Sequence, residues 1–434
     1  MAEQNRLFGM KAESGRWLLV GTGLLINICL GTVYAWSVFV KPLQVFFEMD
    51  PKVAATKSIL PFIVFLAFFA ILMPFAGRLL DKFSPRAVAV LGGIIMALGW
   101  ILSSFAPNMA ILTLTYGIIA GGGVGIIYGV PIAVAGRWFP DKKGLAVGLT
   151  VAGFGGSALI TAPLAKWLIG PADAKLMILG ATFASGSPAI GVMSTFLYLG
   201  IAFLILSIVL SLLMVFPPAG YKPEGWTPPA AAAMVKDMLP GEIIKTSSFY
   251  GLWLCFIIGA LAGLTAIGIA SPCGIEIVKC SAASAAMAVS IFAIFNGVGR
   301  PIFGWLTDKL TPRGATILSF IIIILASIMM LFAVGEGDMT LWVIAFCGFW
   351  LCLGGWLAIA PTSNITFFGA KNAAKNYGIV FSAYGIAAIV GSLISSRLKD
   401  LLGSYLPTFW MTGGLAILGI IIALALIKPP AKKA

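Results

Sequence analysis

The residue in this sequence with the clearest capacity for chemistry is Arg300, which lies inside a long apolar stretch near residues 282–306. An arginine stays protonated when buried, and its planar guanidinium can hold a carboxylate through two parallel hydrogen bonds. Asn296 precedes it by four residues and therefore shares its helix face, where its amide can orient Arg300 or donate to the substrate. Pro301 removes a backbone donor and favours a kink at this point. Together these residues predict a binding site for a small carboxylate anion.

The place of Arg300 along its helix puts it deep in any membrane that the helix crosses. Asp308, at the expected end of the helix, lies eight residues further on, which corresponds to about 12 Å along the axis. The hydrocarbon core of a bilayer is about 30 Å thick, so Arg300 falls near its middle. A cation at that depth costs several kcal/mol unless it faces a cavity or meets an anion.

The composition predicts an all-α integral membrane protein. Of its 434 residues, 60% are hydrophobic and only 10% are charged, far outside the range of soluble domains. Because a span needs about 20 apolar residues, we expect twelve transmembrane helices. They are predicted near residues 17–40, 58–80, 87–105, 110–136, 145–168, 193–216, 249–270, 282–306, 315–334, 341–368, 377–398 and 406–427.

A long polar segment divides these helices into two sets of six. We expect a tail at 1–16, a first six-helix bundle at 17–218, a linker at 219–248, a second six-helix bundle at 249–427 and a tail at 428–434. Most of the 28 Lys and Arg residues fall in segments on the side of the N-terminus, which is the positive-inside pattern. We therefore expect a multi-pass protein of the inner (cytoplasmic) membrane, with both termini in the cytoplasm.

Charge and residue content argue against several other classes of protein. The net charge of +13 is explained by topology, so no nucleic acid partner is expected. The chain has no histidine, and its six cysteines show no metal-ligand spacing, so we expect neither a metal nor another cofactor. No nucleophile with a base, phosphate loop or carboxylate pair lies within the spans, which argues against an enzyme. We expect a monomer in the lipid bilayer.

An internal repeat relates the two halves. The segment GRLLDKFSPR at Gly77–Arg86 recurs as GWLTDKLTPR at Gly304–Arg313, each time at the end of the second helix of its half. Two parallel six-helix halves are a transporter plan, in which the substrate binds between the halves near the membrane midplane. The repeated loop resembles the signature of the major facilitator superfamily. That resemblance implies a gating role at the cytoplasmic face for its charged residues, which are Asp81, Arg86, Asp308 and Arg313.

Finer features resemble the oxalate:formate antiporter family over nearly the whole chain. The matching stretches are GVGIIYG at 123–129, RWFPDKKGLA at 137–146, FNGVGRP at 295–301 and NYG at 376–378. The resemblance implies alternating-access transport of small organic anions, with the arginine of the eighth helix holding a carboxylate. It also implies an aromatic cage around that carboxylate, formed by Tyr34, Tyr128, Phe154 and Phe381.

The sequence departs from this family at positions that decide the substrate. The oxalate-exchanging member has a lysine in helix 11 where this chain has Tyr384. A tryptophan expected in helix 10 is replaced by Leu353, and Trp356 one turn away can substitute for it. Tyr384, Leu353 and Trp356 are therefore candidate substrate-binding residues. One buried cation balances one carboxylate, and burying a second unpaired carboxylate is costly. We therefore expect a monocarboxylate such as lactate, pyruvate or formate rather than oxalate.

The coupling mode stays open between proton symport and exchange. The eighth helix also resembles that of the eukaryotic monocarboxylate transporters, in which an aspartate for proton coupling stands where this chain has Asn296. Glu276 is the remaining weak candidate for a co-transported proton. Charge balance favours exchange, because the loaded carrier buries no net charge and the empty carrier buries one. The alternatives are an oxalate:formate-type antiporter and, from a different class, a membrane receptor that senses a carboxylate.

Overall fold

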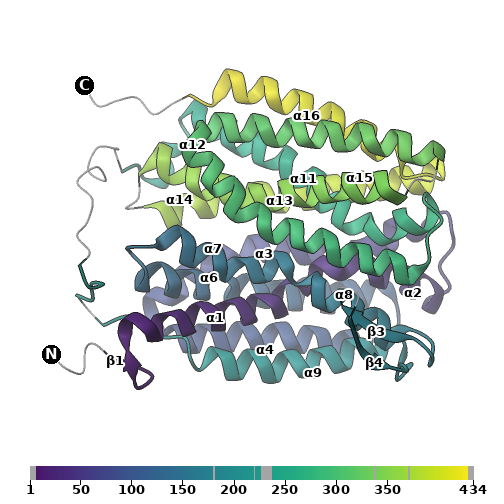
Figure 1. Ribbon diagram of the computed structural model, residues 1–434, viewed down its shortest axis with the longest axis horizontal. Coiled ribbons are helices and arrows are strands. Elements are labelled where there is room, and N and C mark those ends of the chain that lie inside the picture. The colour runs from purple at the N-terminus through teal and green to yellow at the C-terminus, as the bar shows by residue number, and fades with distance from the viewer. Residues whose placement is uncertain are drawn as a thin grey trace.

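The computed structural model describes residues 6–178, 181–218, 220–225, 237–336, 339–369 and 372–428. Within these residues, twelve helices are long and apolar enough to cross a membrane. They stand side by side in two bundles, and the first and last described residues lie at one end of the helices (Figure 1). We refer to that end of the molecule as the termini side and to the other end as the opposite side. The predicted all-α class is confirmed.

The two bundles are continuous pieces of the chain. The first contains α1 (Ala12–Leu30), η2 (Gly31–Ala35), α2 (Trp36–Phe46), α3 (Ala54–Lys82), α4 (Pro85–Ser103), α5 (Met109–Leu112), η3 (Thr113–Ala120), α6 (Gly121–Trp138), α7 (Lys143–Gly156), α8 (Ala158–Ile169) and α9 (Gly191–Ser211). The second contains α11 (Ser247–Glu276), α12 (Ala282–Glu336), α13 (Met339–Phe368), α14 (Ala373–Val380), α15 (Ser382–Leu402) and α16 (Leu406–Leu426), preceded by the short α10 (Pro240–Ile243). Two small hairpins, β1 (Arg6–Leu7) with β2 (Met10–Lys11) and β3 (Lys175–Ile178) with β4 (Ala181–Ser185), complete the described elements.

The bundles meet where helices of the first pack on helices of the second. α12 packs on α7 and α8, α15 packs on α3, and α11 packs on α2. Part of the predicted linker, residues 226–236, lies outside the described residues, as do residues 1–5 and 429–434 of the predicted tails. The linker is tied to the second bundle at its end, where the Met238 N–H donates to the Phe368 carbonyl at 2.9 Å. The residue limits of the halves stay a prediction.

The repeated segment forms the same local structure in both bundles. Ser84 separates α3 from α4, and its hydroxyl accepts a hydrogen bond from the Ala87 N–H at 3.3 Å. In the second copy Thr311 interrupts α12, and its hydroxyl accepts from the Gly314 N–H at 3.5 Å. A proline follows the hydroxyl residue in each copy. A capping hydroxyl followed by proline starts a new helix, so the repeat builds the turn between the second and third spans of each bundle.

Small residues allow close helix packing at some positions of the fifth span but not at all of them. A Cβ atom added to Gly153 would lie 2.2 Å from the Leu24 carbonyl oxygen of α1, so the missing side chain lets the two backbones approach. Nothing lies within 4 Å of such an atom on Gly148 or Gly156. Gly153 therefore makes this contact between α7 and α1, whereas Gly148 and Gly156 do not.

The first helix begins at Ala12, inside the segment predicted as a polar tail. The charge of Arg16 would disfavour burial of the start of this helix, but Asp141 of the loop between α6 and α7 neutralises it. Arg16 Nη1 donates to Oδ1 at 2.7 Å and its Nη2 donates to Oδ2 at 3.1 Å. Arg16 also pairs with Glu13 and lies 4.4 Å from the centroid of the Phe139 ring. These contacts fasten the start of the first span to the turn after the fourth.

Replacing Asp141 with asparagine should lower the midpoint of thermal unfolding by about 2 °C at pH 7. Partial burial alone would raise the pKa of this carboxyl, but the hydrogen bonds from Arg16 and from the backbone, together with the charges of Arg16 and Lys142, outweigh burial and hold the pKa below its ordinary value. The carboxylate therefore stabilises the fold above about pH 4, and the contribution is lost as the pH falls through the lowered pKa. Asp173→Asn, at an exposed position, is the control. Equal midpoints for the two variants at pH 7 would contradict the expectation.

Candidate substrate-binding site

Arg300 is buried where α12 of the second bundle faces α7 of the first. Its side chain is 2% exposed, and its Nη1 donates to the Val151 carbonyl of α7 at 2.7 Å. The buried Nε and Nη2 atoms have no hydrogen-bond partner among the described residues. These two N–H groups form one complete edge of the guanidinium, and such an edge can bind both oxygens of a carboxylate. The arginine is thus held by one nitrogen and presents a free carboxylate-binding edge.

No carboxylate neutralises Arg300 within the described part of the chain, where the ion pairs found are those of Arg16, Lys41 and Lys399. A buried, unpaired cation is costly. An anionic ligand would therefore be stabilised here by charge as well as by hydrogen bonds.

Asn296 is buried one turn before Arg300 and is held by α13. Its Nδ2 donates to the Trp350 carbonyl at 3.3 Å, whereas its Oδ1 has no partner within the described chain. The sequence predicted that this amide orients Arg300 or donates to a ligand. The observed bond from Nδ2 instead connects α12 to α13, and Oδ1 remains as an acceptor near the free edge of the arginine. That the Asn296 amide orients Arg300 or contacts the ligand stays a prediction.

Gly155 of α7 packs closely against this edge of the guanidinium and against Asn296. A Cβ atom added at this position would lie 2.5 Å from Asn296 Oδ1 and 3.1 Å from Arg300 Nε. Gly155 thus belongs to the candidate site.

The substitution Gly155→Ala should weaken binding of a monocarboxylate by about 10-fold, because the added methyl group displaces the two polar side chains or fills the space of the ligand. Gly156→Ala is a matched control, since nothing lies within 4 Å of a Cβ atom there. Affinities of the two purified variants can be compared by titration calorimetry. Equally weakened binding in both variants would mean that the loss comes from a change in the helix rather than from the site.

The four aromatic residues predicted to form a cage lie close together around a phenylalanine that the sequence did not single out, and their contact with a ligand stays a prediction. Phe154 contacts Tyr34 and Tyr128, with ring centroids 5.0 and 5.2 Å apart. Phe69 of α3 lies between Tyr128, Phe154 and Phe381, at 5.0, 5.7 and 5.7 Å. One phenylalanine within an apolar span carries no sequence signal, so only the fold identifies Phe69.

A tyrosine pair connects the two bundles across the cage. The hydroxyls of Tyr34 in η2 and Tyr384 in α15 are 2.6 Å apart and share a hydrogen bond. Tyr384 also stacks on Phe381, with centroids 5.0 Å apart. The structure therefore places Tyr384 inside the cage, at the contact between the bundles.

The tenth span brings Trp350 next to the cage, whereas ligand contacts of Leu353 and Trp356 stay a prediction. Trp356 stacks on Phe256 of α11 at 5.8 Å, and Leu353 lies against Gly263 of α11, so both pack within the second bundle. Trp350, two turns before Trp356, instead approaches Tyr34 at 6.3 Å. Its buried indole Nε1 has no hydrogen-bond acceptor among the described residues. Trp350 is therefore an additional donor next to the cage.

The site is closed toward the opposite side by polar contacts between the bundles. Glu276 of α11 pairs with Lys41 of α2 and binds Lys399 of α15 at 2.5 Å. The carboxylate of Asp400 accepts the backbone N–H groups of Ala55 and Thr56, at 3.0 and 2.8 Å. Glu276, the weak candidate for a proton, is thus held by two amines near the end of α11. These contacts join α11 and α15 to the first bundle.

The four residues predicted to gate lie at the turns on the termini side. Arg86 is exposed at the start of α4. Arg313 binds the end of α16, where its Nε donates to the Ile427 carbonyl at 2.8 Å. The side chains of Asp81 and Asp308 lie outside the described part of the structure. The gating role of these four residues stays a prediction.

Twelve spans in two bundles, closed around a buried arginine with a free edge, define a membrane transporter. The chain belongs to the Major Facilitator Superfamily, whose sequence profile matches residues 23–368 and 252–434. The resemblance seen in the repeated loop is therefore confirmed. The protein is a multi-pass membrane transporter and not an enzyme.

Individual relatives agree with this assignment. The chain is 30% identical to the oxalate:formate antiporter of Oxalobacter formigenes, over 89% of this chain and 86% of that protein. It is 25% identical to monocarboxylate transporter 12 of Homo sapiens, over 95% of this chain and 81% of that one. A bacterial homologue of the human lysosomal transporter Spinster, in an inward-facing and occupied conformation, has the same fold, with a TM-score of 0.66, 17% identity and 95% coverage of each chain.

Proposed function

We propose that this protein is an alternating-access secondary transporter of small monocarboxylates of the lactate, pyruvate and formate class. The observation that carries the proposal is the free Nε and Nη2 edge of Arg300, buried between the two bundles. A carboxylate on this edge receives two charge-assisted hydrogen bonds and neutralises the cation. The names of the relatives, an oxalate:formate antiporter and monocarboxylate transporters, support the same ligand class.

The preference for one carboxylate follows from the charge of the cage. Tyr384, Tyr34, Phe154 and Phe69 surround the site with hydroxyls and rings. Arg300 is the one charged side chain that we assign to it. A second carboxylate placed against these groups would lose its hydration without gaining a cation. A monocarboxylate leaves its apolar remainder in contact with the rings, where burial is favourable.

Alternating access requires the two bundles to rock about the buried site. In the observed state the contacts of Glu276 and Asp400 close the opposite side. We assign the termini side to the cytoplasm, because most of the Lys and Arg residues lie there. The membrane is then the cytoplasmic membrane. The related Spinster structure is described as inward-facing, which supports a state of this fold that is open toward the cytoplasm.

Exchange is the mode that the charges favour. When the empty carrier changes from one open side to the other, Arg300 is buried without an anion. In the loaded carrier Arg300 is paired with the substrate, and the pair is neutral. Proteoliposomes filled with unlabelled lactate should therefore take up labelled lactate about 10-fold faster than empty ones at equal pH on both sides. Uptake into empty vesicles that equals exchange when driven by a pH gradient would contradict exchange and favour proton symport.

Exchange of oxalate for formate is the second candidate, favoured by the 30% identity to the antiporter of Oxalobacter formigenes. The two candidates differ in what the vesicles accept. Labelled lactate, pyruvate, formate and oxalate should be compared as substrates in the same preparation. Uptake of the three monocarboxylates but not of oxalate is expected, and uptake of oxalate alone would reject the proposed substrate class.

A further inference from the structure

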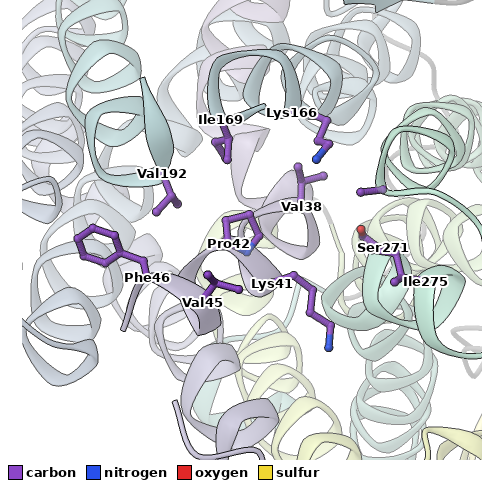
Figure 2. A pocket seen from close by; sticks show the side chains of 11 residues that line it. Val38, Lys41, Pro42, Val45, Phe46, Lys166, Ile169, Val192, Ser271 and Ile275 are labelled. Carbon is purple, nitrogen blue, oxygen red and sulfur yellow. The ribbon is translucent and has the colours of Figure 1, made fainter. Parts of the chain in front are cut away.

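A pocket of about 440 Å³ opens between the bundles on the opposite side of the molecule. The ends of α2 and α8 and the start of α9 line it from the first bundle, and the end of α11 and the start of α12 line it from the second. Figure 2 shows Lys41 and Lys166 around Val38, with Ser271 and Ile275 on the neighbouring helix. The proposed carboxylate site does not include these residues.

The pocket lies further toward the opposite side than the cage, along the same spans. Val38 comes four residues after Tyr34, a rise of about 6 Å along a helix. Lys166 comes twelve residues after Phe154 on the fifth span, which is about 18 Å further toward the opposite side. A small anion that moves between the bundles from that side toward Arg300 would therefore pass the pocket first.

The pocket carries an excess of positive charge on a mostly apolar wall. Lys41 and Lys399 share the carboxylate of Glu276, and the described residues that line the pocket include two lysines and no carboxylate. Lys166 is partly buried, and no carboxylate pairs with it within the described residues. A partly desolvated ammonium group without a counter-ion raises the local concentration of anions, because the apolar walls screen its field weakly.

We propose that this pocket is a capture site, in which the carboxylate of the substrate binds Lys166 before it moves to Arg300. The inference rests on the proposed function. An anion held at Lys166 also lies in the pocket that Lys41 lines, so it competes with Glu276 for Lys41. Lys41 belongs to the first bundle and Glu276 to the second. Capture of the substrate therefore weakens an ion pair that closes this side and favours opening toward the incoming anion.

The substitution Lys166→Gln tests the capture site, with Lys175→Gln as the control. Lys175 is an exposed lysine of β3 on the same side, so both variants lose one positive charge there. Lactate uptake should be measured in vesicles of both orientations made from phosphatidylcholine, at low and at high salt. For uptake from the opposite side, Lys166→Gln should raise KM by about 10-fold at low salt with little change in kcat, and salt should reduce the effect.

The two faces of the membrane provide the internal comparison. Uptake from the termini side should keep its KM in Lys166→Gln, because that path does not cross the pocket before Arg300. The capture site would be overturned if the KM of Lys166→Gln equals that of Lys175→Gln, or if it rises equally for uptake from both sides. Transport by the wild type would in either case still uphold the proposed function. An effect found only when phosphatidylglycerol is added would assign the pocket to a lipid headgroup and overturn it too. Wild-type vesicles that take up no monocarboxylate would reject the proposed function, and the inference with it.

Discussion

Arg300→Lys should reduce the rate of lactate exchange at sub-saturating substrate by about 100-fold, although the variant keeps the positive charge. The ammonium group of lysine is a point charge and cannot form the paired Nε and Nη2 contact. The loss of two charge-assisted hydrogen bonds corresponds to about 3 kcal/mol. In addition, lysine cannot reproduce the bond from Arg300 Nη1 to the Val151 carbonyl, which orients the guanidinium in the wild type.

The control for this variant is Arg397→Lys, at an exposed position of α15. It makes the same chemical change away from the cage and should keep the exchange rate near that of the wild type. The thermal midpoint of each purified variant shows whether it is folded. A folded Arg300→Lys protein with near-normal exchange would mean that the substrate does not use the bidentate edge.

Tyr384→Lys should change the class of acid that the transporter accepts. The variant replaces the hydroxyl bonded to Tyr34 with a second cation inside the cage. Two cations repel each other in a buried site, so the empty variant should unfold at a lower temperature than the wild type. A dianion neutralises both charges, and oxalate should therefore restore stability. We expect the ratio of oxalate affinity to lactate affinity to rise by about 100-fold.

Tyr384→Leu separates the added charge from the lost hydroxyl. It also breaks the bond to Tyr34, but it adds no cation, so the affinity ratio should stay near that of the wild type. Binding can be followed for all three proteins by calorimetry with lactate and with oxalate. An affinity ratio that is unchanged in Tyr384→Lys would show that the residue at this position does not select between mono- and dicarboxylates.

The sequence predicted the parts of the fold that depend on composition and on rare residues. The spans follow from apolar length, and Arg300 is recognisable because a charge inside a span is uncommon. The repeat at Gly77–Arg86 and Gly304–Arg313 identified equivalent turns because it places a hydroxyl residue before a proline in both. Such features are local, and a single sequence records them directly.

The neighbours of Arg300 required the three-dimensional structure. Phe69 and Trp350 resemble the many other aromatic residues of the spans, and only the crossing of α3 and α13 with the helices around the cage brings them there. The contact of Gly155 with Asn296 and Arg300 joins helices from different bundles. The sharing of Glu276 between two lysines likewise depends on three helix ends that are far apart in the chain.

Orientation of the side chains is a further step that residue types do not determine. Asn296 lies on the predicted helix face, but its amide bonds to the backbone of α13. Trp356 lies one turn from the position expected to face the cage, but it stacks on Phe256. Hydrogen-bond partners and ring packing, rather than spacing, decide which side of each helix reaches the ligand.

The most direct test of the account is the binding of lactate, pyruvate, formate and oxalate to the purified protein and to Arg300→Ala, measured by thermal stabilisation. We predict that the three monocarboxylates raise the unfolding midpoint of the wild type, that oxalate does not, and that the variant responds to none of them. Stabilisation of Arg300→Ala equal to that of the wild type would contradict the central claim that the free edge of Arg300 holds the substrate carboxylate.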